Sequence, residues 1–414
     1  MADRSLTAAL GTRLTVRYRL TPWWAKVIVV FAASRVITTS ILLAFASIQQ
    51  QNPWTGARPG YADFATIWDG HWYYIIAAVG YPTELPLTAE GQVGESAWAF
   101  MPAYPAVVRL LMAVSGLGFP VLAVTVSVAC ALGAALLFYR VIALVLPGST
   151  ALFSVVLFCV APLSPVLQVS YAESMGILLL TLALYLLLSR RYWLLVPVVA
   201  VMALTRPSGL AFALLMALHV GQRWWASRPA RPNPELFPVA DRVAASAVAI
   251  FSGLMGISWI LIAWAVTGDL HAYTSTELAW RSAYIGYQEL VPFTPWLWGT
   301  QWWSGWLGIP LALGVLLLGL IVAGFFGALF LPQVKRLGVD LRFWLASYAL
   351  YLLAVFFPQS STFRLLMPLF PALGALAQPR SVAYRVVLVL VFIAGQVAWV
   401  WACWWVDGSD WSPP

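Results

Sequence analysis

Residues 63–82 read DFATIWDGHWYYIIAAVGYP, and after a short acidic run residues 95–105 read ESAWAFMPAYP. This segment lies between hydrophobic stretches that are long enough to cross a lipid bilayer. Asp69 follows Trp68 and comes just before His71, and the aromatic run after it is compatible with a helix. A carboxylate in such apolar surroundings is unfavourable unless it is paired or functional. We therefore predict that this segment carries the function of the chain.

The composition of the chain is that of a membrane protein. Of its 414 residues, 62% are hydrophobic and 9% are charged, and the mean hydropathy is +0.85. The apolar runs reach about 18 residues or more, too long and too continuous for barrel strands. We predict an all-α polytopic membrane protein. Cys130, Cys159 and Cys403 lie in apolar segments without metal-ligand spacing, so we interpret them as small hydrophobic residues.

The order of the apolar segments predicts one membrane domain over residues 23–406, between a basic segment over 1–22 and a short tail over 407–414. We predict about eleven crossings, with boundaries uncertain by a few residues. They are expected at 23–48, 119–145, 151–168, 174–189, 192–204, 207–221, 243–267, 307–331, 343–358, 364–379 and 386–406.

Charged residues indicate the orientation. The positive-inside rule places the Arg-rich N-terminus in the cytoplasm. With that start, most of the 23 Lys and Arg fall on the cytoplasmic side and most of the 15 Asp and Glu fall outside or near it, so the net charge of +8 is an orientation signal. No basic stripe or recognition module indicates a nucleic-acid partner. We expect a protein of a bacterial plasma membrane whose C-terminus is extracytoplasmic.

The pair at 192–204 and 207–221 has two interpretations. The segments meet at Thr205-Arg206-Pro207-Ser208-Gly209, which is a helix-breaking turn. A hairpin keeps the following basic loop, RWWASRPARP, in the cytoplasm, whereas a single kinked helix would move that loop outside. The charge rule favours the hairpin.

Two long outer loops are predicted over about 49–118 and 268–306. Long loops in a compact protein are usually functional, although their many aromatic residues are also typical of a belt at the membrane surface. The first loop can form helices lying along the membrane interface over 68–81 and 98–115. Asp69 would begin the first of these, where an acid can also be a simple helix cap.

Five stretches run in register with the signature of a known family. They are WDGHWYYIIAAVGY (68–81), WAFMPAYP (98–105), APLSPVLQVSYAESMGILLL (161–180), LTRPSGL (204–210) and QSSTFRLLMPLFP (359–371). In this order they resemble the PIG-V-type mannosyltransferases, the family of the second mannosyltransferase in GPI-anchor assembly. The likeness extends from about residue 23 to residue 380. Gly70-His71, Pro207-Ser208 and Met101 depart from the family pattern, which bears on fine specificity more than on class.

The resemblance implies membership of the GT-C superfamily of integral-membrane glycosyltransferases. These enzymes have outward-facing active sites, use polyprenyl- or dolichyl-phosphate sugars and usually invert the anomeric centre. The expected reaction moves a mannosyl residue from polyprenyl-phosphate mannose to a lipid-linked or glycolipid acceptor. The alternatives are a GT-C enzyme that uses another polyprenyl-phosphate sugar, a lipid or glycolipid transporter or flippase, and a structural partner subunit.

Sugar transfer from a lipid phosphate needs a base for the acceptor hydroxyl and positive charge for the departing phosphate. We predict Asp69 as the general base, with His71 as a second candidate on another side of the helix. Arg206 and Arg364 lie in family-like motifs and are expected to bind the phosphate, since guanidinium groups grip phosphate oxygens bidentately.

Other residues are predicted to bind substrate. Glu173 either contacts sugar hydroxyls or pairs with an arginine, and it can also be an ordinary helix cap. Trp68 and Tyr104 belong to the aromatic motifs. His271 and Arg281, in the second loop, would contact donor or acceptor, although a solvated loop helix explains them equally well.

No nucleotide motif and no metal-ligand cluster is evident in the sequence. We therefore expect neither a cofactor nor a metal. The expected partners are membrane lipids, the polyprenyl-phosphate donor and a lipid or glycan acceptor. A transporter would instead show internal repeats and paired interrupted helices, and the sequence has no clear repeat.

Overall fold

A computed structural model describes residues 20–231, 234–289 and 291–406. In this part the chain is helical, and its β-structure is a single bridge between Leu87 and Val93. Most of the predicted N-terminal segment 1–22 and the whole predicted tail 407–414 lie outside the described residues. The all-α prediction is confirmed for the described part.

Five described helices are long and apolar enough to cross a membrane. They are α2 (Trp23–Ile48), α6 (Phe119–Ala143), α11 (Val239–Thr267), α15 (Leu311–Ala328), and α20 (Val382–Trp399) with its π-helical end η4 (Val400–Trp404). The shorter elements between α2 and α11 are α3 (Tyr61–Phe64), α4 (Asp69–Val79), η1 (Ala97–Ala99), α5 (Ala103–Ser115), α7 (Gly148–Val160), η2 (Ser164–Gln168), α8 (Glu173–Leu188), α9 (Tyr192–Ala203) and α10 (Gly209–Ala226). Those after α11 are α12 (Ala272–Ala279), α13 (Ser282–Ile285), α14 (Thr294–Leu307), α16 (Pro332–Lys335), α17 (Val339–Val355), α18 (Thr362–Leu365), η3 (Met367–Ala372) and α19 (Leu373–Leu376).

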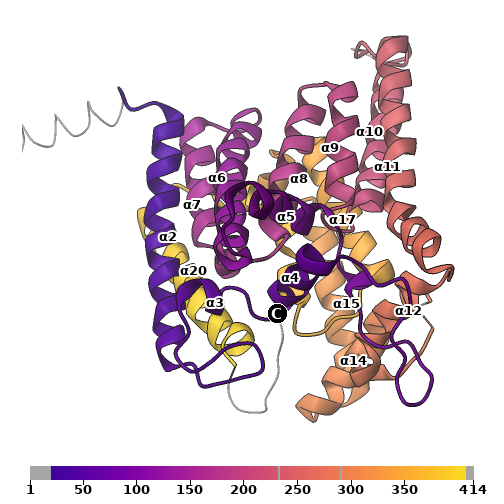
Figure 1. The fold of residues 1–414 in the computed structure, drawn as a ribbon. Coiled ribbons are helices and arrows are strands. Elements are labelled where there is room, and N and C mark those ends of the chain that lie inside the picture. Colours follow the sequence, from indigo (N-terminus) through magenta and orange to yellow (C-terminus); the bar gives the residue numbers. More distant parts are fainter. Residues whose placement is uncertain (1–19, 232–233, 290, 407–414) are drawn as a thin grey trace, which may run out of the picture.

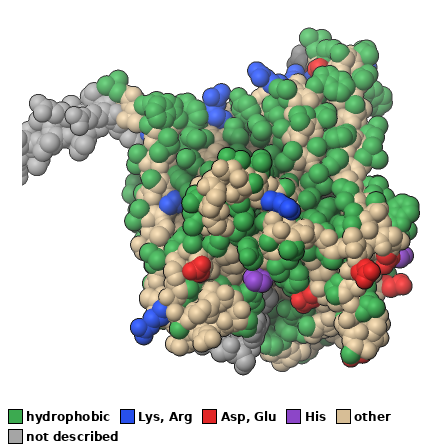
Figure 2. Space-filling view, in the orientation of Figure 1, with side chains coloured by type: hydrophobic (Ala, Val, Ile, Leu, Met, Phe, Trp, Pro, Cys, Tyr) green, Lys and Arg blue, Asp and Glu red, His purple; other side chains and the backbone are tan. Residues whose placement is uncertain are grey.

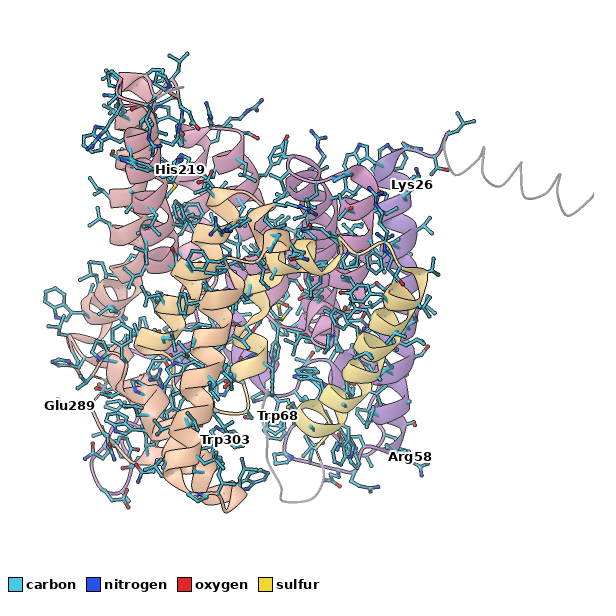
Figure 3. The ribbon with its side chains drawn as sticks, turned by 180° about the vertical axis from the view of Figure 1, so that it is seen from behind. Lys26, Arg58, Trp68, His219, Glu289 and Trp303 are labelled. Atoms are coloured by element: carbon cyan, nitrogen blue, oxygen red, sulfur yellow. The ribbon has the colours of Figure 1, made fainter. Side chains whose placement is uncertain are left out.

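Most of the long helices share one large hydrophobic core (Figure 1). α6 packs against α7 and α8, with α2 beside α7, and α10 packs against α11 and α17. α9 contacts both α8 and α11 and so connects these two sets of helices. Figure 3 shows Lys26 and His219 at one end of the bundle, here named the basic end, and Arg58, Glu289 and Trp303 at the opposite end, here named the loop end. On the face in Figure 2, hydrophobic side chains cover most of the surface, and most Asp and Glu lie in the half toward the loop end.

Several predicted crossings are interrupted in the structure. The segment predicted at 151–168 is α-helical only to Val160, because Pro162 and Pro165 follow and lack the N–H that an α-helix needs, and its last residues form the 3-10 helix η2. The single helix predicted at 364–379 is wrong: α18, η3 and α19 replace it, and Pro368 and Pro371 interrupt the helical hydrogen bonding.

The segments α9 and α10 form a hairpin. Tyr192, which begins α9, lies beside the end of α10: its hydroxyl is 3.0 Å from Nε2 of His219 and accepts a hydrogen bond from Nη1 of Arg223 at 2.8 Å. The chain therefore turns back at residues 204–208, as the charge pattern predicted, and Arg206 lies in the turn.

Arg35, on α2, fixes the irregular segment between α7 and α8. The side chain is buried, and its guanidinium donates to the carbonyl of Cys159 at 2.8 Å, to the carbonyl of Ser164 at 3.1 Å and to Oε1 of Gln168 at 2.9 Å. Five neutral acceptors in all, including the hydroxyls of Ser34 and Ser164, satisfy its donors. A buried arginine saturated in this way has a structural role.

A close helix contact joins α10 to α11. A Cβ atom on Gly256 would lie 2.7 Å from the backbone nitrogen of Leu210, which is closer than side-chain carbons approach backbone atoms. Oγ of Ser252 also donates to the carbonyl of Gly209 at 2.8 Å. This approach holds the first turn of α10, and with it the preceding turn that carries Arg206.

We predict that Gly256→Ala destabilises the protein, because the added methyl group must push two backbones apart at a cost of about 1–3 kcal/mol. The measurement is the thermal unfolding midpoint of the detergent-solubilised protein. Gly253→Ala is the matched control on the same helix, since a Cβ there would meet only Cβ of Ala213, at 3.9 Å. Equal midpoints for the two variants would contradict this account of the contact.

Candidate functional site

Four charged side chains from distant parts of the sequence meet inside the bundle. Nη1 of Arg364 donates to Oδ2 of Asp69. Nε of Arg364 lies 3.4 Å from Oε1 of Glu173, and Nη2 of Arg206 lies 3.3 Å from the same oxygen. We name Asp69, Glu173, Arg206 and Arg364 the charge cluster. With two carboxylates and two guanidiniums it is formally neutral.

Each member of the charge cluster lies at a break between helices. Asp69 begins α4, Glu173 begins α8 after the proline-interrupted segment, and Arg206 lies in the turn of the hairpin. Arg364 lies on α18, just after α17 ends. Chain breaks inside an apolar bundle free backbone groups and bring side chains inward, and such breaks are typical of functional sites in membrane proteins.

The aliphatic part of Arg206 lies across α8 at Gly176. A Cβ on Gly176 would be 3.1 Å from Cγ of Arg206, so a larger residue would displace the arginine. Gly176 is one helical turn after Glu173, which explains why Arg206 reaches the Glu173 carboxylate.

The backbone just before Asp69 is strained. Trp68 has φ 58° and ψ −127°, a conformation that is rare for a bulky residue. Its indole N–H donates to the carbonyl of Trp404 at 3.1 Å, and its ring packs against Trp54 with centroids 4.5 Å apart. Figure 3 shows Trp68 in the half of the molecule toward the loop end. These contacts hold the strained residue and thereby fix the direction in which α4 begins.

Tyr171 links the backbone of Asp69 to Arg364. Its hydroxyl accepts a hydrogen bond from the Asp69 amide at 3.2 Å, and the Arg364 guanidinium lies over its ring at 5.1 Å. Tyr171 is fully buried. Our prediction of site residues did not include it, although it stands two residues before Glu173 in the motif SYAES.

The charge cluster is largely removed from solvent but is not saturated with hydrogen bonds. Side-chain exposure is 15% for Asp69 and 8% for Arg364. Within the described part of the chain, neither carboxylate oxygen of Glu173 accepts a hydrogen bond, and Nε of Arg364 donates none. Burial raises the pKa of the Asp69 carboxyl above its usual range, while the positive charge of Arg364 opposes that rise. The cluster therefore retains capacity to bind a polar ligand.

The other predicted site residues lie apart from these contacts. His71 is exposed, with its ring centroid 6.2 Å from that of Tyr74. Tyr104 is fully buried, and its hydroxyl donates to the carbonyl of Ala123 at 2.9 Å. His271 is exposed at the start of α12.

Arg281 belongs to a second ion pair. Its guanidinium donates to Glu277 at 3.2 Å and to the carbonyl of Val355, the last residue of α17, at 3.3 Å. The pair thus joins α12 to the same break in the chain that precedes Arg364.

The alternative that Asp69 and Glu173 serve as helix caps receives no support from their contacts. The residues in the N-cap positions are Trp68 and Ala172, and neither gives a side-chain cap. The carboxylates of Asp69 and Glu173 face arginines instead.

No family model matches this chain, and no curated protein matches it in sequence. In the described ranges, no group of three or more His, Cys, Asp or Glu side chains is arranged to hold a metal ion. Metal independence stays a prediction.

We predict that Arg364→Gln destabilises the protein by about 3 kcal/mol, because it leaves two buried carboxylates without their shared cation. The loss should shrink in an Asp69→Asn background, where one of those carboxylates is already neutral. The measurement is a double-mutant cycle on denaturant unfolding in detergent. Arg109→Gln, at an exposed position on α5, is the control and should change little. Additive effects of the two substitutions would show that the pair is not coupled.

Proposed function

We propose that the protein is a membrane glycosyltransferase that moves a mannosyl residue from polyprenyl-phosphate mannose to a lipid-linked or glycolipid acceptor. The single observation that carries the proposal is the charge cluster, in which two arginines face two carboxylates at helix breaks deep in an apolar bundle. Four of the five family-like stretches supply one side chain each to the charge cluster, which supports the resemblance to PIG-V-type enzymes of the GT-C superfamily.

The roles follow from the charges. Arg206 and Arg364 bind the donor phosphate, because guanidiniums in a low-dielectric site stabilise the charge that develops on a leaving phosphate. Asp69 accepts the proton of the acceptor hydroxyl as that oxygen attacks the anomeric carbon, and the bond from this carbon to the phosphate oxygen breaks. Attack from the face opposite the phosphate inverts the anomeric centre. Glu173 holds both guanidiniums toward the same point.

Phosphate binding and base activation are linked in this scheme. In the structure Arg364 pairs with Asp69. A donor phosphate competes for the same guanidinium, and the carboxylate that loses its cation becomes more basic. Asp69 then becomes an effective base only when the donor is bound.

The finer topology belongs to this proposal. We propose about eleven crossings, a number that includes the interrupted segments. In this topology the loop end and the charge cluster lie on the extracytoplasmic face. A bacterial plasma membrane is the expected location. The choice of mannose comes from the family resemblance, and another polyprenyl-phosphate sugar is the alternative within the same class.

We predict that Asp69→Asn abolishes transfer while the protein remains folded. Loss of a general base lowers the rate by about 10²–10⁴-fold. The measurement is transfer of radiolabelled mannose from polyprenyl-phosphate mannose to a membrane lipid extract by the protein in liposomes. Asp63→Asn, at an exposed position on α3, is the matched control and should keep full activity.

The same experiment separates the enzyme from a transporter, which would also use interrupted helices. Movement of labelled lipid between leaflets without any transfer product in the unsubstituted protein would exclude the enzyme. Undiminished transfer by a folded Asp69→Asn variant would exclude Asp69 as the base.

We predict that activity falls as the pH falls through the pKa of Asp69. That pKa is raised by burial, so the carboxyl is protonated at a pH where an ordinary aspartate is ionised, and a protonated base cannot accept a proton. The measurement is the pH profile of kcat/KM for the donor. Activity that stays constant down to pH about 4, near the usual aspartate pKa, would contradict the assignment.

A further inference from the structure

Three aromatic rings, one of them on the helix that carries Asp69, pack together. Trp72 of α4 stacks on Phe100 with ring centroids 5.7 Å apart and an interplanar angle of 12°. Trp280, just after α12, meets both rings edge-on, at 5.4 Å from Trp72 and 5.8 Å from Phe100. We name Trp72, Phe100 and Trp280 the aromatic wall. It joins the two long loops that the sequence predicted.

The aromatic wall lies close to the charge cluster. Trp72 follows Asp69 by three residues on α4, so the two side chains share one face of that helix. Arg281, the neighbour of Trp280, is bonded to Glu277 and to the end of α17. These hydrogen bonds fix the position of Trp280 relative to the segment after α17 that carries Arg364.

Trp280 has a buried indole N–H without a hydrogen-bond partner in the described part of the chain. Buried indole N–H groups usually find an acceptor. Seven other tryptophans of this protein each donate to a backbone carbonyl: Trp68 to Trp404, Trp98 to Pro82, Trp259 to Trp98, Trp296 to Leu352, Trp303 to Pro358, Trp344 to Pro368 and Trp404 to Phe64.

Two further tryptophans have the same unpaired N–H, but in different surroundings. Trp399 packs against Trp404. Trp405, for its part, packs against Phe45 of α2. Trp399 and Trp405 therefore both lie at the C-terminal end of α20 and its extension η4. Trp280 alone among these three contacts the aromatic residues of α4, next to the proposed base.

We propose that the aromatic wall is a pyranose subsite, in which a sugar ring lies against Trp72 and one of its hydroxyl oxygens accepts a hydrogen bond from Nε1 of Trp280. A pyranose has an apolar C–H face and a rim of hydroxyls, and an aromatic surface with one directed donor matches both features. The subsite rests on the proposed function, because it names where that reaction holds a sugar. The ring belongs either to the donor or to the acceptor.

The test compares binding of three probes to the full-length protein in nanodiscs: a short-chain polyprenyl-phosphate mannose, the same polyprenyl phosphate without sugar, and methyl mannoside in the presence of saturating polyprenyl phosphate. Trp280→Phe removes the N–H and keeps an aromatic ring. Trp72→Leu removes the stacking surface. Trp401→Phe is the control, since Trp401 is 63% exposed on the end of α20.

If the donor sugar occupies the subsite, Trp280→Phe weakens binding of polyprenyl-phosphate mannose by about fivefold to tenfold, the value of one hydrogen bond. Binding of sugar-free polyprenyl phosphate stays unchanged, because that ligand depends on the arginines. If the acceptor sugar occupies it, only binding of methyl mannoside weakens. Trp72→Leu weakens the same probe as Trp280→Phe in either case.

The subsite is overturned if Trp280→Phe binds all three probes as the unsubstituted protein does, or if it weakens the two polyprenyl ligands equally. A different result overturns the proposed function: the unsubstituted protein does not bind polyprenyl phosphate at all.

Discussion

The ion pair between Arg364 and Asp69 is the constraint on which the arrangement of the bundle depends. A charge inside an apolar bundle is tolerated only when an opposite charge meets it. The two partners lie 295 residues apart in sequence, so the early helix α4 and the late helix α18 must meet. Glu173 also lies beside Arg364, and Arg206 balances the charge of Glu173. The positions of α8 and of the α9–α10 hairpin follow from that chain of neutralisation.

The need to pair buried charges also explains why helices begin or end at the charge cluster. A continuous helix keeps its side chains at its surface, whereas an interrupted one can direct a side chain from its end into the space between neighbours. Prolines and tight turns supply the interruptions, and saturated groups such as the Arg35 guanidinium hold the irregular backbone in place. The close glycine contact between α10 and α11 has the same effect for the turn that carries Arg206.

The sequence predicted the helical class and four residues of the charge cluster, because a charged residue in apolar surroundings stands out and has few permitted roles. It did not predict which arginine meets which acid, since pairing depends on contacts between distant helices. The apolar composition of residues 364–379 predicts a continuous helix, although Pro368 and Pro371 interrupt helical hydrogen bonding. Neither Trp72 nor Trp280 is among the predicted site residues, because aromatic residues are ordinary at a membrane surface. The missing acceptor of the Trp280 N–H, together with the contact of its ring with Trp72 of α4, separates that residue from the other tryptophans.

The contacts of Trp404 have a consequence for the order of synthesis. Trp404 donates to the carbonyl of Phe64 and accepts from the indole of Trp68, and it lies near the end of the described chain. During translation the segment around Asp69 leaves the ribosome long before Arg364 and Trp404 exist, and domains of a chain fold as their parts emerge. Until then, Asp69 lacks its cation and Trp68 lacks the contact that holds its strained backbone. The nascent protein therefore cannot complete the charge cluster until the segment that carries Arg364 has been made.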